Sequence, residues 1–121
     1  MAADLHATFA WFVVVGNGLA GAWALAAHWW EPARVRALWI ATAVVQVSIF
    51  VQVALGVVAL GDIEGDPDQF HLFYGFVALA TVGIIYSYRS QLAERRYLLY
   101  GGGGLFLMGL ALRSMQFSQP A

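Results

Sequence analysis

The stretch "LWIATAVVQVSIFVQVALGVVALG" (residues 38–61) decides the fold, because 24 consecutive, mostly apolar residues carry no charge. A helix rises about 1.5 Å per residue, so roughly 20 apolar residues cross the hydrocarbon core of a bilayer, which is about 30 Å thick. Backbone groups in hydrocarbon must pair with each other, and a helix pairs them within one segment. The stretch therefore predicts a membrane-spanning helix.

Three further stretches have the same character, at residues 7–30, 70–88 and 97–112, and the last of them is the shortest. No charged residue lies in 7–30, 38–61 or 70–88. The composition agrees, since 61% of the residues are hydrophobic and 11% are charged, too few charges to coat a soluble domain. The sequence predicts an all-α membrane protein in one domain over residues 1–121, with four transmembrane helices in an up-down bundle of two hairpins.

The charged residues between these stretches predict an orientation. Arginines occupy the first and third loops, and acidic residues occupy the N-terminus and the second loop: Arg34, Arg36, Arg89, Arg95, Arg96; Asp4, Asp62, Glu64, Asp66, Asp68. Cytoplasmic loops of membrane proteins are enriched in basic residues. We therefore expect the first and third loops in the cytoplasm and both termini outside, in the inner membrane of a bacterial cell. Among the arginines, only Arg113 lies against this trend.

Several classes of function have no residues to support them. The chain has no Cys, which excludes disulfides, thiolate metal sites and Fe–S clusters. All six basic residues are dispersed arginines, so no nucleic-acid partner is expected. We find no nucleophile and base pair, phosphate-binding loop or metalloprotease motif, and we expect neither catalytic residues nor a metal site made by side chains alone.

Two histidines occupy matching places in a faint internal repeat. "LHATFAWFVVVGNG" (5–18) and "FHLFYGFVALATVG" (70–83) align with His6 opposite His71. Each segment is followed by an arginine-bearing loop and another helix, as expected for two hairpins that point the same way. Two apolar helices also align by chance, so duplication is one of two explanations.

The histidine pair has two interpretations. If the first and third helices run in the same direction, His6 and His71 lie near the outer entrance of each, where they are candidate axial ligands of one haem b. Alternatively, each is an interfacial histidine with one ring edge in water. His28, at the inner end of the first helix, has no second inner histidine, so a two-haem relay is not expected.

A resemblance to a known family supports the haem interpretation. "QVALGVVAL" (52–60), an acidic turn and "HLFYGFVALATVG" (71–83) resemble one four-helix half of haem A synthase and, more loosely, small b-type cytochromes. In such proteins histidines on alternate helices bind haem near the outer face, and a Gln-x-x-Leu-Gly stretch lies in the preceding helix. The resemblance implies the same roles for His6 and His71. Haem A synthase has two such halves, and here one stands alone.

Polar and small residues inside the spans predict helix packing. An unpaired amide in hydrocarbon is costly, so Asn17, Gln46 and Gln52 are expected to form hydrogen bonds between helices. Glycines let helix backbones approach closely, and the run "GGGG" (101–104) predicts close contact, a bend, or a groove for a lipid or partner. The candidate packing residues are Gly16, Asn17, Gly18, Gln46, Gln52, Gly101 and Gly104.

These features favour a non-catalytic integral membrane subunit of a larger complex. Small-residue faces suit contacts with other membrane subunits and lipids, and reactive groups are lacking. The haem-like pattern indicates a respiratory or electron-transport complex. The alternative is a small b-type cytochrome with one bis-histidine haem near the outer face, which transfers electrons or reduces quinone.

Overall fold

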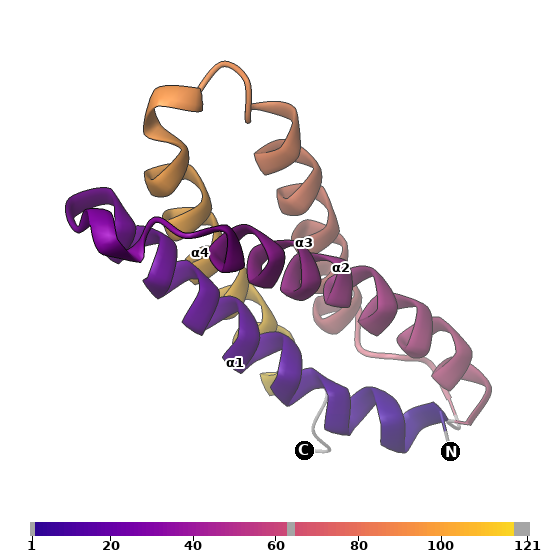
Figure 1. The fold of residues 1–121 in the computed structure, drawn as a ribbon. Helices are drawn as coiled ribbons and strands as arrows, with labels where there is room; N and C mark the ends of the chain where they lie inside the picture. Colours follow the sequence, from indigo (N-terminus) through magenta and orange to yellow (C-terminus); the bar gives the residue numbers. More distant parts are fainter. Residues whose placement is uncertain (1, 63–64, 118–121) are drawn as a thin grey trace.

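The computed structural model describes residues 2–62 and 65–117, and this part of the chain forms four long helices. They are α1 (Ala2–Trp29), α2 (Arg36–Ala59), α3 (Gln69–Ser87) and α4 (Arg96–Gln116), joined through the short 3-10 helices η1 (Glu31–Ala33), η2 (Leu60–Asp62) and η3 (Ala93–Arg95) (Figure 1). Each of the four is long and apolar enough to cross a membrane. By length and composition the chain is an integral membrane protein.

Two helices extend further than the apolar stretches that predicted them. α1 begins at Ala2 instead of residue 7, and α4 continues to Gln116 instead of residue 112. Hydropathy marks the part of a helix that lies in hydrocarbon, whereas polar residues extend the same helix beyond it. As a result His6 and Ser114 both belong to helices.

The start of α3 follows from its local sequence. Asp68 has an extended backbone, and its Oδ1 atom accepts a hydrogen bond of 2.8 Å from the Phe70 amide. This side-chain cap satisfies one of the amides that the first turn of a helix leaves unpaired. It places His71 in the first turn of α3. The acidic loop that leads to Asp68 includes Glu64, which lies outside the described residues.

The helices pack with α1 at the centre. α1 lies along both α2 and α4, and α3 lies along α4, whereas α2 and α3 make few contacts with each other. Figure 1 shows the pair of α1 and α2 crossing the pair of α3 and α4 at an angle. We call the end that holds His6 and His71 the histidine end, and the opposite end, with Arg34 and Arg96, the arginine end.

Glycines bring α1 and α4 into backbone contact. A Cβ atom on Gly104 would lie 2.8 Å from the Gly21 Cα, and one on Gly101 would lie 2.8 Å from the Leu25 amide nitrogen. A Cβ on Gly21 would lie 2.8 Å from the Leu105 nitrogen. Backbone atoms cannot move aside as side chains do, so this crossing requires residues without a Cβ.

The other predicted packing residues of α1 face two different helices. The Asn17 amide nitrogen donates to Val13 O at 2.9 Å and to Val45 O on α2 at 3.3 Å. A Cβ on Gly16 would lie 2.8 Å from Val45 Cγ1, and one on Gly18 would lie 2.6 Å from Met108 Sδ. Thus Gly16 faces α2, Gly18 faces α4, and Asn17 joins α1 to α2.

Two apolar clusters fill the interior. One lies between the helices on the side of the histidine end and includes Val13, Ile49, Ala78, Leu107 and Leu110. The second lies at the arginine end and includes Ala24, Ala27, Leu38 and Tyr97.

Candidate cofactor site

The rings of His6 and His71 lie next to each other. Their centroids are 5.8 Å apart and their planes are nearly perpendicular, at 89°. His6 comes from the second turn of α1 and His71 from the first turn of α3. Two residues 65 positions apart in the sequence therefore meet at the same depth.

A reciprocal pair of hydrogen bonds holds His6 against α2. The ring Nδ1 lies 3.0 Å from the backbone oxygen of Gln52. In return, the side-chain amide of Gln52 donates to the backbone oxygen of His6 at 2.7 Å. Both the ring and the backbone of His6 are therefore fixed to one residue of α2.

His71 is held against α4 by the same kind of pair. Its Nδ1 lies 2.9 Å from the backbone oxygen of Ser114 and 2.9 Å from the Ser114 hydroxyl. That hydroxyl lies 3.2 Å from the backbone oxygen of His71, to which it donates. Each histidine is thus anchored by a polar residue of the helix that follows it in sequence.

These contacts select one tautomer for both rings. A backbone carbonyl only accepts hydrogen bonds, so each Nδ1 carries the proton and each Nε2 keeps its lone pair. Within residues 2–62 and 65–117, no hydrogen bond occupies either Nε2 atom. Metal-binding histidines nearly always donate their second ring nitrogen to a carbonyl or carboxylate in this way. Both rings are therefore prepared to act as ligands.

Gly56 provides the space for the His6 ring. A Cβ atom at Gly56 would lie 2.9 Å from Cε1 of the ring and 3.4 Å from its Nε2. Gln52 and Gly56 are four residues apart and share one face of α2, so the first bonds the histidine and the second accommodates it. In the sequence they are the first and last residues of the stretch Gln-Val-Ala-Leu-Gly at 52–56.

The ring separation suits one metal ion between the two histidines. Nitrogen ligands lie about 2 Å from such an ion, and each ring centroid lies about 1 Å behind its nitrogen, so centroids on opposite sides are about 6 Å apart. In the described part of the chain, no group of three or more His, Asp or Glu residues is placed to hold a metal ion. A macrocycle that supplies the remaining ligands fits this two-histidine set.

Space beside the pair is available on α3. A Cβ atom at Gly75, one turn after His71, would have no atom within 4 Å. α2 and α3 make few contacts with each other. Arg113, the residue before Ser114, donates to the Gln116 side chain at 2.6 Å and lies over the Phe117 ring, 4.9 Å from its centroid. The open position at Gly75 fits a flat group beside His71.

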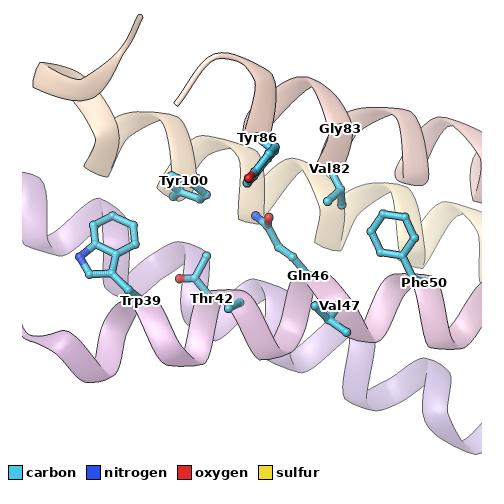
Figure 2. A pocket seen from close by; sticks show the side chains of 10 residues that line it. Trp39, Thr42, Gln46, Val47, Phe50, Val82, Gly83, Tyr86 and Tyr100 are labelled. Atoms are coloured by element: carbon cyan, nitrogen blue, oxygen red, sulfur yellow. The ribbon is translucent and has the colours of Figure 1, made fainter. Parts of the chain in front are cut away.

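A second hollow lies between α2 and α3, towards the arginine end (Figure 2). It has a volume of about 580 Å³. Gln46 lines it, forms no hydrogen bond with another described residue, and therefore does not make the interhelical bond that its sequence context predicted. Gln52, six residues later, faces α1 instead.

Sequence reasoning missed several residues that form these sites. Ser114 lay beyond the predicted end of the fourth helix, and Gly56 was noted only as part of the Gln-x-x-Leu-Gly stretch. Thr42, which lines the second hollow, resembles any small residue of an apolar helix. The available signal was the spacing of Gln52 and Gly56, which places both on one face. His28 lies at the arginine end, where its ring contacts Trp29 with centroids 4.6 Å apart.

Comparison with known proteins identified no matching family model, no matching curated protein and no matching solved structure.

Proposed function

We propose that this protein is a small b-type cytochrome that binds one haem b between His6 and His71. The observation that carries the proposal is that two imidazoles meet with each Nδ1 bonded to a backbone carbonyl and each Nε2 left as a ligand. Haem iron held by two such ligands exchanges single electrons. The resemblance to a half of haem A synthase points to the same pair of residues.

The chain's own residues would set the properties of the bound group. Gln52 and Ser114 orient the rings and raise the basicity of the ligand nitrogens by accepting the Nδ1 protons on their carbonyls. The apolar cluster beneath the pair excludes water from the inner side. We further propose that the histidine end faces outwards from a bacterial inner membrane, because the arginines gather at the other end.

The test is a visible spectrum of the purified protein after expression with ample haem. We expect a Soret band in the wild type, and we expect its loss in His6→Ala and in His71→Ala. His28→Ala is the matched control, because it removes the third histidine from the other end of the same fold. A colourless wild-type protein, or equal bands in all three variants, would rule out this site.

A second candidate function is that of a subunit in a larger membrane complex. One face of α4 supports it. Gly102 and Gly109 lie on that face, where an added Cβ would meet no atom of this chain within 4 Å. Phe106 lies between them and is 55% exposed. A helix face with two glycines that no described residue covers is suited to close approach by a helix of another subunit.

This candidate is tested by mild solubilisation of membranes followed by mass spectrometry of the proteins that co-purify. We expect a defined set of membrane proteins with the wild type, and we expect Gly102→Leu with Gly109→Leu to release it. Recovery of the wild type as an isolated monomer would count against the subunit role. The two candidate functions are compatible, because one protein can bind haem and also be a subunit of a larger membrane complex.

A further inference from the structure

The groove between α2 and α3 has features of a ligand site beyond its size. Its volume of about 580 Å³ lies within the range of small-molecule sites, about 300–1,000 Å³. Aromatic rings stand at both ends, with Trp39, Tyr86 and Tyr100 towards the arginine end and Phe50 at the other (Figure 2). Gly83 lies on its α3 wall, and an added Cβ there would meet no atom within 4 Å.

One buried polar atom in this wall has no hydrogen-bond partner. Thr42 lines the groove and is only 5% exposed, yet its Oγ1 forms no hydrogen bond with any described residue. A helical threonine can usually bond the carbonyl one turn earlier, and Thr81 does so with Val77 O at 2.7 Å. A buried hydroxyl without a partner is costly. Rotation of the Thr42 side chain about χ1 would turn this hydroxyl towards the groove, where a ligand that accepts its hydrogen bond would gain from it.

The other polar groups of the groove are neutral. Figure 2 shows the Gln46 side chain extending from α2 towards Tyr86 on α3. None of the described residues that line the groove is charged. The nearest arginines lie over aromatic rings at the arginine end, with the Arg89 guanidinium 3.7 Å from the Tyr86 ring centroid and that of Arg96 5.9 Å from the Trp39 ring centroid. The groove therefore suits an uncharged ligand.

We propose that this groove binds a quinone-type lipid, a neutral flat ring with carbonyl oxygens on an isoprenoid tail. The ring would lie among Trp39, Tyr86 and Tyr100, where aromatic faces favour stacking. Its oxygens would accept from the Thr42 hydroxyl and the Gln46 amide. The tail would leave past Val47 and Phe50 towards the membrane.

The polar groups distinguish this ligand from an ordinary membrane lipid. A phospholipid places its charge at the interface and offers the groove only acyl chains, which would leave the Thr42 hydroxyl unpaired. A quinone carries its oxygens on the ring itself, at the depth of Thr42 and Gln46. The proposal rests on neither histidine, so it stands or fails separately from haem binding.

The test is a titration of the full chain in phosphatidylcholine nanodiscs with a benzoquinone that carries two isoprene units, followed by quenching of tryptophan fluorescence. We expect saturable binding to the wild type. Loss of one hydrogen bond in Thr42→Val should weaken binding about two- to tenfold, and Gly83→Leu should abolish it by filling the groove. Thr81→Val and Gly102→Leu are the matched controls, because they make the same changes outside the groove.

Three results would overturn the proposal. The first is quenching that does not saturate in the wild type. The second is unchanged affinity in both Thr42→Val and Gly83→Leu. The third is equal competition by a plain acyl chain of similar length, such as octanoic acid methyl ester, with no effect of Thr42→Val; this would show an acyl-chain groove only. Binding that weakens in the groove variants and not in the controls supports the proposal.

Discussion

Gln52 and Ser114 perform the same task on two different helices. Each offers its backbone oxygen to the Nδ1 of a histidine and donates from its side chain to the backbone oxygen of that same histidine. The backbone oxygen fixes the tautomer of the histidine ring, and any residue at that position would provide this oxygen. The side chain adds the second bond, which keeps the histidine's helix at the correct height.

Replacing Gln52 with Leu therefore separates the two contributions. Leu keeps the backbone oxygen that bonds the His6 ring but removes the side-chain amide that bonds the His6 backbone, so the ring loses its fixed height. We expect haem affinity to fall about tenfold, as it does when a residue that hydrogen-bonds a metal ligand is replaced. Stability should change little, because the Gln52 Oε1 atom is itself buried without a partner. Haem titration of the apoprotein measures the first effect, and thermal unfolding in detergent measures the second.

Gln46→Leu is the control for this experiment. Gln46 lies on the same helix and has the same chemistry, but it faces the groove between α2 and α3. We expect its haem affinity to equal that of the wild type. Equal losses in both variants would show that the effect comes from removing an amide anywhere in α2.

At the same scale, sequence reasoning found the histidines but not what holds them. His6 and His71 are two of three histidines in a chain with few charges, so they are conspicuous. Ser114 is one of several serines, and its partner lies 43 residues away in another helix. Such a pairing depends on how two helices are placed relative to each other, which hydropathy does not encode.

Among the elements, the contact of α1 with α4 is the most demanding. The glycines at 101–104 do not share one environment. Gly101 and Gly104 face α1, whereas a Cβ atom on Gly102 would meet no described atom within 4 Å. Helical periodicity explains this, because residues three apart share a face and the two residues between them do not. Neighbouring glycines in one helix therefore have opposite requirements.

Alanine substitutions test this difference by the sign of their effects. In Gly104→Ala the added Cβ would lie 2.8 Å from the Gly21 Cα, so α1 and α4 must separate, and we expect a loss of about 1–3 kcal/mol. In Gly102→Ala the methyl group meets open space and alanine favours helix by about 1 kcal/mol, so we expect no loss. Unfolding by a denaturing detergent measures both, and similar effects would contradict the assigned contact.

The helices themselves were largely predictable. Each of the four expected spans corresponds to an observed helix, because about 20 apolar residues admit few alternatives in a membrane protein. The ends were less predictable, since α1 and α4 continue for several residues past their apolar stretches. Those extensions contain His6 and Ser114, so the candidate site lies where hydropathy is least informative.

On the scale of the whole molecule, the reciprocal hydrogen-bond pairs of His6 with Gln52 and of His71 with Ser114 relate the two halves of the chain. His6 pairs with a residue 46 positions later, and His71 pairs with one 43 positions later. In both halves the first helix carries a histidine at its start and the second carries the anchor near its end. This likeness of contacts adds to the faint sequence repeat as support for duplication of one helical pair.

The direction in which the bundle crosses the membrane can be tested with single cysteines, since the chain has none. Asp66 precedes α3 at the histidine end, and Glu94 lies in η3 at the arginine end; both are exposed. Because the arginines should face the cytoplasm, we expect a membrane-impermeant maleimide to label Asp66→Cys in intact spheroplasts. Glu94→Cys should react only after the membrane is permeabilised.

Labelling before and after permeabilisation provides the control within each variant, because a full reaction afterwards shows that the thiol is accessible. The reverse pattern would place the histidine end in the cytoplasm, and an electron partner for a haem there would have to be cytoplasmic too. Equal labelling of both thiols in intact cells would mean that the chain inserts in two directions. In that case the arginines would not determine the orientation, and the haem would have no fixed side.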